Sequence, residues 1–279
     1  MLTIKDLDHA LILVRDLNDA DVAMRRLGFK PTPRGVHSVH MGTANSTVMF
    51  GDMTYFELLG VLDPTPANYD MRETLERGDS LFGIALKTDD ARATVKELAE
   101  VSAADGEAVN FSRPVDMPAG LEEAAFSIAN VAAARVLGIK MFACQHHTPD
   151  VVWRPGYSDQ PNGATGVNAV AGSVPDTDEA GRQMTALFGD RVVCEEGSVT
   201  VKLNNASLSF LTPAKMHEAH GIYVDDETAL RVLSLKTRSI DVTRKTLREN
   251  HVEFTDRARG VVTVPAKSAC GAVIEFVAQ

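Results

Sequence analysis

The chain has 279 residues, 44% of them hydrophobic, and a formal net charge of −10, so it is long enough for one large or two ordinary globular domains. The acidic balance argues against nucleic acid and anionic membranes as partners, because both need a basic footprint. No apolar run approaches the roughly 18 residues of a bilayer-spanning helix, and the N-terminus lacks the basic and apolar blocks of a signal peptide.

Three well-separated cysteines, Cys144, Cys194 and Cys270, form neither a disulfide framework nor a CxxC pair. This usage predicts a reducing, cytoplasmic location. Cys144 and Cys270 lie in apolar, strand-like contexts, which favours buried and inert thiols.

A short apolar strand, an acidic cap and an amphipathic helix recur four times along the chain, and each copy predicts a βαβββ module. In the first copy we expect strands at 7–15, 29–32, 45–51 and 54–61, with a helix capped by Asp16 and ended by Gly28. In the second we expect strands at 82–87, 108–111, 123–129 and 139–144, with a helix capped by Asp89 or Asp90.

The third copy predicts a strand at 167–174, a helix at 176–188 closed by Gly189, and strands at 198–203 and 207–211. A short helix at 213–220 then carries His217 and His220, which we expect on a solvated face. The fourth copy predicts a strand at 231–236, a helix at 242–250, and strands at 261–264 and 272–277.

A segment rich in Pro, Gly and polar residues separates the second and third copies. We therefore expect a first pair of modules at 1–150, a linker at 151–165 that Trp153 pins to one half, and a second pair at 166–279. One module leaves an open curved sheet, and two modules facing each other close it into a cup. The predicted fold class is thus α+β, with four βαβββ modules paired into two half-barrel cups.

At this point the chain resembles the vicinal oxygen chelate superfamily, which includes glyoxalase I, extradiol dioxygenases and bleomycin-resistance proteins. The resemblance rests on the paired modules, with His9 opening the first strand and Glu57 in the fourth. More narrowly, the segments HMGTANSTVMFGDMTYFELLG (40–60), FSRPVD (111–116) and HHTPDVVWRP (146–155) are similar to glyoxalase-like proteins.

The resemblance implies a divalent metal held by inward residues of the first and fourth strands and chelated by two adjacent substrate oxygens. In the first module these ligands are His9 and Glu57. In the second module Gly83 cannot ligate, so the third ligand comes from Gln145, His146 or His147, with His146 preferred. A His-Glu-His shell suits Zn, Ni, Mn or Fe.

In the second half the matching positions are Asn168, Ser209, Val232 and Glu275. One carboxylate among four positions cannot hold a metal. We therefore expect this half to be structural or auxiliary.

Each candidate also has a simpler structural interpretation. His9 could be satisfied by a backbone carbonyl, and Glu57 could face outward, with Phe56 and Leu58 inward instead. We nevertheless expect Glu57 to be a functional, inward-facing residue, since a carboxylate among large apolar side chains is costly unless it is paired or bound to metal. The resemblance to glyoxalase I implies that Glu57 is also the catalytic residue that moves a proton.

Three further residues are candidates for substrate binding. Asn45 could donate to a substrate oxygen or cap a turn, and His147 lies next to the preferred third ligand. Arg113 could clamp a substrate carboxylate or pair with Glu123 or Asp116.

The resulting functional hypothesis is a divalent-metal-dependent lyase or isomerase of the glyoxalase-like type, acting on a small cytoplasmic metabolite with vicinal oxygens. One alternative is a metal-free small-molecule binding or drug-sequestering protein. A second alternative is a non-haem iron dioxygenase of the extradiol type. The expected partner is a small-molecule substrate, and homodimer formation is open.

Overall fold

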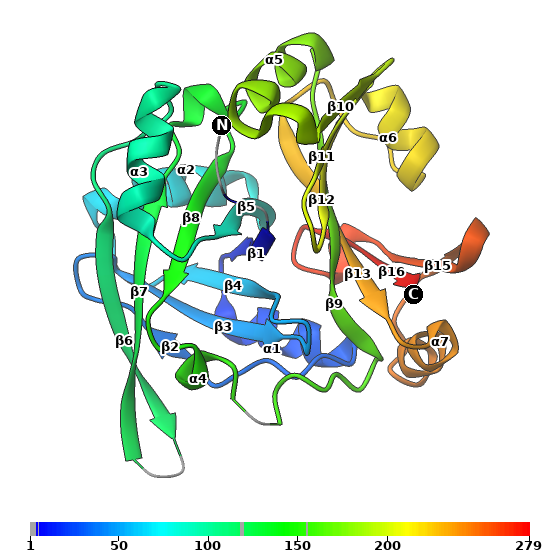
Figure 1. Ribbon diagram of the computed structural model, residues 1–279. Helices are drawn as coiled ribbons and strands as arrows, with labels where there is room; N and C mark the ends of the chain where they lie inside the picture. The colour runs from blue at the N-terminus through cyan, green and yellow to red at the C-terminus, as the bar shows by residue number, and fades with distance from the viewer. Residues whose placement is uncertain (1–3, 5, 118–119, 155) are drawn as a thin grey trace.

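The computed structural model describes residues 4, 6–117, 120–154 and 156–279, which form two sheets of eight strands with helices packed around them (Figure 1). The first half contains β1 (Asp6–Val14), α1 (Leu17–Arg26), β2 (Gly35–Val36), β3 (Thr43–Met49), β4 (Tyr55–Val61), η1 (Pro66–Asn68), α2 (Tyr69–Arg77), β5 (Ser80–Lys87), α3 (Ala91–Glu100), β6 (Val109–Met117), β7 (Gly120–Asn130), η2 (Ala133–Arg135), β8 (Lys140–His146) and α4 (Pro149–Val152).

The second half repeats this order. It contains β9 (Ala164–Ser173), α5 (Thr177–Phe188), η3 (Gly189–Arg191), β10 (Val192–Glu195), β11 (Ser198–Lys202), β12 (Ser207–Leu211), α6 (Pro213–His220), β13 (Ala229–Thr237), α7 (Ile240–Glu249), β14 (Thr255–Arg257), η4 (Ala258–Gly260), β15 (Val261–Val264), η5 (Ala266–Ser268) and β16 (Val273–Ala278). No described helix combines the length and apolarity that crossing a membrane requires.

The strand orders are β2-β3-β4-β1-β5-β8-β7-β6 and β10-β11-β12-β9-β13-β16-β15-β14, so four βαβββ modules pair into two sheets as predicted. Within each sheet the first strands of the two modules run antiparallel at the centre, as β1 does beside β5. Each first strand also pairs in parallel with the last strand of its own module, as β1 does with β4. The outermost strands β2 and β6 of the first sheet come into contact, which nearly closes it into a barrel.

Side-chain caps explain where the module helices begin. The carboxylate of Asp16 accepts hydrogen bonds from the backbone N–H groups of Asn18 and Asp19, and Asp90 and Asp176 cap α3 and α5 in the same way. Each such cap is worth about 1 kcal/mol. The fourth repeat differs, because the hydroxyl of Ser239 caps α7 and the acidic residue of the repeat, Asp241, lies in the first helical turn.

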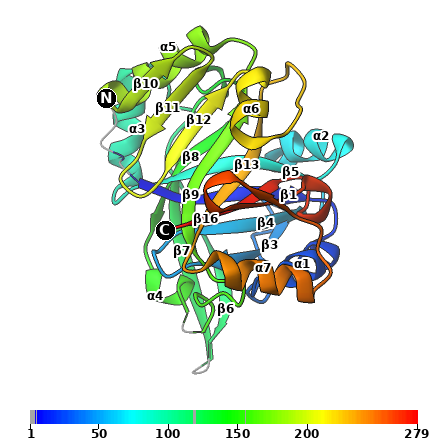
Figure 2. The ribbon, with the colours of Figure 1, turned by 90° about the vertical axis from the view of Figure 1, so that its right-hand side faces the viewer.

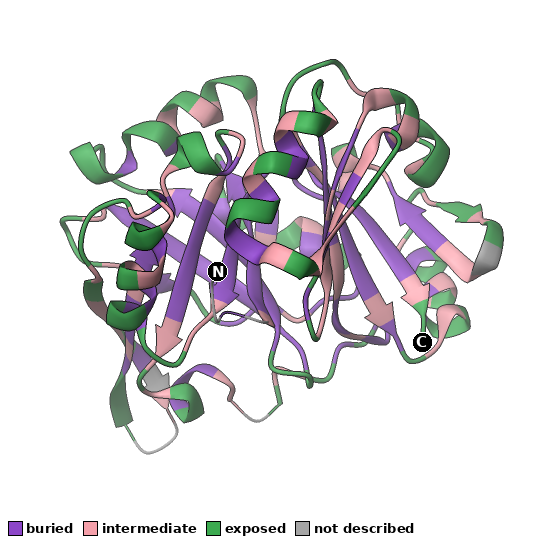
Figure 3. Cartoon of the chain, turned by 45° about the horizontal axis from the view of Figure 1, so that its top comes forward, coloured by how far each residue is buried: buried purple, intermediate pink, exposed green. Residues whose placement is uncertain are grey.

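The faces of the two sheets that carry the helices share one hydrophobic core, which includes Phe56, Phe210 and Phe276. Buried residues concentrate in the strands, whereas the outer helix faces are exposed (Figure 3). Phe29 of the first half stacks on Phe276 of the second at a centroid distance of 5.8 Å. The opposite sheet faces form two cups with cores of their own.

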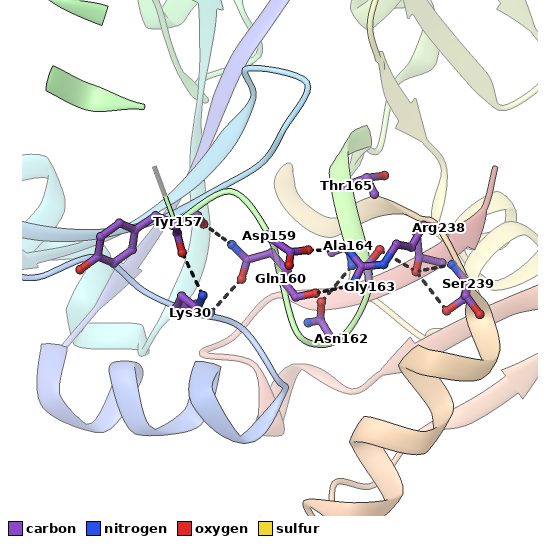
Figure 4. A network of polar contacts seen from close by, with 12 residues as sticks. Lys30, Tyr157, Asp159, Gln160, Asn162, Gly163, Ala164, Thr165, Arg238 and Ser239 are labelled. Atoms are coloured by element: carbon purple, nitrogen blue, oxygen red, sulfur yellow. Dashed lines mark hydrogen bonds and ion pairs between the residues drawn. The ribbon is translucent and has the colours of Figure 1, made fainter. Parts of the chain in front are cut away.

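The segment that connects α4 to β9 is held by polar contacts to both sheets (Figure 4). The side chain of Gln160 accepts from the backbone N–H of Lys30 at 2.8 Å, and Asp159 pairs with Arg238 at 2.7 Å. Asn162 donates to the carbonyl of Leu27 at 3.0 Å. Because these side chains bond to both halves, this segment ties the two sheets together.

Candidate active site

The cup of the first sheet encloses a cavity of about 280 Å³. Its walls are mainly apolar and come from both modules, with Leu11, Leu59, Phe82, Phe126 and Phe142 among the lining residues. Polar and charged side chains also line it, among them His9, His37, Asn45, Glu57 and Arg113. A concave apolar site with a few convergent polar groups is the usual form of a small-molecule site.

Strand register determines that Glu57 faces this cavity. In the parallel pair of β1 and β4, His9 lies beside Tyr55 and Leu11 beside Glu57. Since side chains alternate along a strand, Phe56 and Leu58 face the opposite core, where they are fully buried. The outward interpretation of Glu57 is therefore wrong.

A β-bulge at Asp8 shapes the floor of the cup. The register between β1 and β5 shifts between Leu7 and His9, so Asp8 has no residue opposite it. Bulges of this kind re-aim side chains and are common beside active sites. Here the bulge allows Asp8, which is completely buried, to contact the neighbouring His9 ring.

Five side chains form a continuous polar chain across the cup. Asn45 Nδ2 donates to Glu57 Oε1 at 2.6 Å, and Glu57 Oε2 faces His9 Nε2 at 3.7 Å. The other ring nitrogen, His9 Nδ1, contacts Asp8 Oδ1 at 2.7 Å. The same oxygen of Asp8 contacts His146 Nε2 at 3.0 Å. His9 thus lies between two carboxylates.

Asp8 is ionised in this arrangement. Burial alone would raise its pKa, but hydrogen bonds from His146 and His9 outweigh the burial and lower the pKa to about 2. Because an ionised carboxylate only accepts hydrogen bonds, His9 Nδ1 carries a proton. In a neutral imidazole, Nε2 then points a lone pair at Glu57 Oε2.

His9 Nε2 and Glu57 Oε2 are placed so that they can bind a divalent cation between them. Two lone pairs that face each other at 3.7 Å in a buried site need a positive charge between them, either a proton or a metal ion. Bonds of about 2.0–2.2 Å from a metal to imidazole nitrogen and to carboxylate oxygen are long enough to span that distance. The contact from Asp8 would hold His9 in the tautomer that metal binding requires.

Arg113 lies at the point where the two outermost strands meet. A Cβ built on Gly35 of β2 would lie 2.7 Å from Arg113 Nη1 and 2.8 Å from Asn45 Oδ1. Glycine therefore lets the guanidinium and the amide approach this backbone. Burial lowers the pKa of Arg113, and the nearby Glu57 carboxylate partly offsets that effect.

His37 is a cavity residue that sequence reasoning missed. Its Nδ1 contacts Thr43 Oγ1 at 2.8 Å, and burial lowers its pKa from the ordinary value. The neighbouring Glu57 raises the pKa and Arg113 lowers it. A buried imidazole that favours its neutral form is suited to accept a proton or a hydrogen bond from a ligand.

Two predicted site residues lie away from the cavity. His146 is behind Asp8, with its ring against Trp153 at a centroid distance of 4.6 Å, so Asp8 separates it from His9 and Glu57. Trp153 is thereby packed on the first half, as expected. His147 is exposed, and its Nε2 contacts Ser127 Oγ at 2.6 Å.

The bulge recurs in each module, and it corrects the alignment of the repeats. Asp8, Phe82, Asn168 and Arg231 each occupy the bulged position, directly before His9, Gly83, Ala169 and Val232. Ala169, rather than Asn168, therefore corresponds to His9 in the third module. In the second module Gly83 corresponds to His9, and Phe142, beside Ala85, corresponds to Glu57.

Residues of α6 occupy part of the second cup, and a cavity of about 740 Å³ remains beside them. Helix α6 lies beside the strands of the second sheet (Figure 2). Its Met216 is completely buried and packs with Leu211, Val232 and Val273. Glu275 lies beside Ser234, the same place that Glu57 takes beside Leu11. It pairs with His220 Nδ1 at 3.0 Å and Arg257 Nη1 at 3.4 Å, so His220 is a structural partner and not a solvated residue.

Cys144 lines the first cavity, close to Asp8 and His146. Potential metal ligands of Asp8, Cys144 and His146 all lie within 4.8 Å of one another, which makes this group a second candidate metal site. The sequence contains a signal for it, since Cys144 and His146 are two apart on one strand and share a face. Sequence reasoning missed it because Asp8 reaches that face only through the bulge.

The three thiols should differ strongly in reactivity. Burial raises the pKa of Cys144 well above its ordinary value and that of Cys270 to about 12, so both remain protonated at pH 8. Cys194 is exposed. We therefore expect iodoacetamide to modify only Cys194 in the native metal-free protein and all three thiols after denaturation, as measured by mass spectrometry. Rapid native labelling of Cys144 would contradict this assignment.

Comparison with known proteins agrees with this geometry. A model of the glyoxalase-like domain matches residues 7–188. No curated protein matches the chain. Among solved structures, a hypothetical protein from Staphylococcus aureus has a TM-score of 0.69 at 13% identity, with 98% of this chain and 99% of the other covered.

Two enzymes share the same fold. A triple mutant of 4-hydroxymandelate synthase from Streptomyces coelicolor has a TM-score of 0.61 at 14% identity, with 99% of this chain and 93% of the other covered. The Mn(II)-bound glyoxalase from Novosphingobium aromaticivorans has a TM-score of 0.60 at 10% identity, with 99% and 82% covered.

Proposed function

Because the chain belongs to the family of glyoxalase-like domain proteins, we propose that its first cup is the active site of a divalent-metal-dependent lyase or isomerase. The observation that carries this proposal is the buried pair of His9 Nε2 and Glu57 Oε2, which face each other at 3.7 Å in the apolar cavity. His9 and Glu57 would hold the metal, and two adjacent oxygens of the substrate would complete its coordination. The metal, when bound, would supply Lewis-acid polarisation of those oxygens.

The protein residues account for binding and proton transfer. Glu57 is the one carboxylate among the described residues that line the cavity, and the hydrogen bond from Asn45 fixes one of its oxygens. Its other oxygen, Oε2, would serve as a metal ligand before turnover. During turnover this oxygen would give up its place on the metal to the substrate, take a proton from a carbon next to a substrate oxygen and return it to the neighbouring carbon. The apolar walls exclude water, which strengthens every charge interaction in the cup.

Arg113 supports a substrate that carries a negative charge. Its guanidinium lines the cavity close to Glu57 and Asn45. A planar cation with forked donors matches a carboxylate or phosphate. The remaining aromatic and aliphatic walls suit a small apolar substituent. The substrate class is thus a small anionic metabolite with vicinal oxygens. Three free thiols support our proposal of a reducing, cytoplasmic location.

The metal content of tag-free protein tests this proposal. We expect plasma mass spectrometry to find one ion of Zn, Ni, Mn or Fe fewer per chain in Glu57→Ala than in the wild type, because the variant loses one of two ligands. Equal metal content in both proteins, after dialysis against each of these ions with iron kept anaerobic, would refute the metalloenzyme proposal.

A metal-free binding protein is the second candidate, and one specific observation favours it. The positions of the second module that correspond to His9 and Glu57 are Gly83 and Phe142, neither of which can bind a metal. A Cβ on Gly83 would approach Lys140 to 3.1 Å, so this position has little room for a larger side chain. A wild-type protein that binds anionic ligands but no metal would support this candidate.

A further inference from the structure

We propose that Asp8, Cys144 and His146 form a second metal site, specific for a thiophilic divalent ion such as Zn²⁺, beneath the floor of the first cup. This site is separate from the His9–Glu57 pair and does not depend on the function proposed for that pair. Imidazole nitrogen, thiolate sulfur and carboxylate oxygen together make up a donor set that zinc commonly uses.

The three side chains lie close enough together to share one ion, because one ligand atom of each lies within 4.8 Å of the others. His146 Nε2 lies 3.0 Å from Asp8 Oδ1 and 3.7 Å from Cys144 Sγ. Zinc bonds of about 2.0–2.2 Å to nitrogen and oxygen and about 2.3 Å to sulfur separate neighbouring ligands by similar amounts. The ring of His146 is held by Phe126 and Trp153, at centroid distances of 5.1 and 4.6 Å.

Unpaired atoms at this place point to a missing partner. Asp8 Oδ2 is completely inaccessible to solvent and has no hydrogen-bond partner among the residues that the structure describes. Leaving such an oxygen unpaired costs about 1–3 kcal/mol or more. A metal ion bound to Oδ2 would satisfy it, while Oδ1 continues to accept the hydrogen bond from His9.

The site is accessible and has a defined proton balance. Cys144 lines the cavity, so an ion can reach the sulfur from the cup. On binding, the thiol releases its proton to solvent, and His146 moves its proton from Nε2 to Nδ1, an atom that is unpaired in the metal-free protein. One proton is therefore released for each ion bound. Metal coordination ionises a thiol that burial otherwise keeps neutral.

Cobalt titration tests this site. Metal-stripped protein carrying Cys194→Ser, which removes the exposed thiol, is titrated anaerobically with Co²⁺. We expect a near-ultraviolet thiolate-to-cobalt band that saturates near one ion per chain. Cys144→Ser should abolish the band, Asp8→Asn should weaken Co²⁺ binding about 10- to 100-fold, and the buried but isolated Cys270→Ser should change nothing.

Two measurements keep the result decisive. Circular dichroism shows whether Cys144→Ser is folded. X-ray absorption of the zinc-loaded parent protein does not depend on that variant, and it should find one sulfur ligand at about 2.3 Å from zinc. Absence of the band and of the sulfur ligand, or a band that survives Cys144→Ser, would overturn the proposal. If Glu57→Gln kept both its activity and the thiolate-to-cobalt band, the proposed function would be refuted. The site formed by Asp8, Cys144 and His146 would still be supported.

Discussion

Glu57→Gln is expected to lower the affinity of the first cup for Ni²⁺ about 100-fold or more and to reduce turnover of vicinal-oxygen substrates by about 10²- to 10⁴-fold. The glutamine amide has nearly the same shape as the glutamate carboxylate, and its oxygen can still accept the hydrogen bond from Asn45. Its nitrogen can donate to His9 Nε2, which lies 3.7 Å from Glu57 Oε2 in the wild type. The Tm should therefore stay the same or rise. Calorimetric Ni²⁺ titration and thermal unfolding measure both effects.

Glu275→Gln is the matched control, because Glu275 takes the corresponding place in the second cup. His220 and Arg257 pair with the Glu275 carboxylate, so the burial of this carboxylate is explained without a bound metal. We expect unchanged Ni²⁺ affinity and activity with a lower Tm. An equal loss of Ni²⁺ binding in both variants would show that Glu57 acts only through stability.

Gly271→Ala is expected to lower the free energy of unfolding by about 3 kcal/mol, which corresponds to a Tm lower by roughly 5 °C. Gly271 has a φ of +80°, in the left-handed region that side chains disfavour. A Cβ there would also overlap the backbone carbonyl of Asp79, which belongs to the other half of the molecule. Because backbone cannot rotate away as a side chain can, the two halves would have to separate locally. Denaturant unfolding at equilibrium measures the loss.

Gly106→Ala separates the two contributions. Its φ of +77° is nearly identical, but no atom in the described part of the chain lies within 4 Å of the added Cβ. This variant therefore carries the conformational cost alone, about 1 kcal/mol. If Gly271→Ala were no more destabilising than Gly106→Ala, the close approach of the two halves at Asp79 would contribute nothing to stability.

The module architecture could be predicted from sequence because its signals are local. Apolar strands, the caps Asp16, Asp90 and Asp176, and the helix-ending Gly28 all lie within short segments. The elements that were missed have weak local patterns: the edge strands β10 and β14, and the helices α2 and α4. The second strand was expected at 29–32 and lies at Gly35–Val36, where only two residues pair.

The site was less predictable, because its geometry depends on strand register. Alternation along β4 was enough to suggest that Glu57 and its neighbours face opposite sides. No local pattern reveals the bulge at Asp8, which changes the face of one residue and brings a carboxylate between two histidines. The same bulge in β9 explains why the repeat alignment at Asn168 was one residue out.

Strands β2 and β6 meet beside the side chains that we propose bind an anionic ligand. These strands are the two ends of the first sheet's hydrogen-bonded order, so they touch without being paired in that ladder. Arg113, from β6, lies against Gly35 of β2 at this junction. Among the described residues no backbone ladder therefore joins these two edges. An anion that pairs with Arg113 and Asn45 would contact side chains from both edges and hold them together.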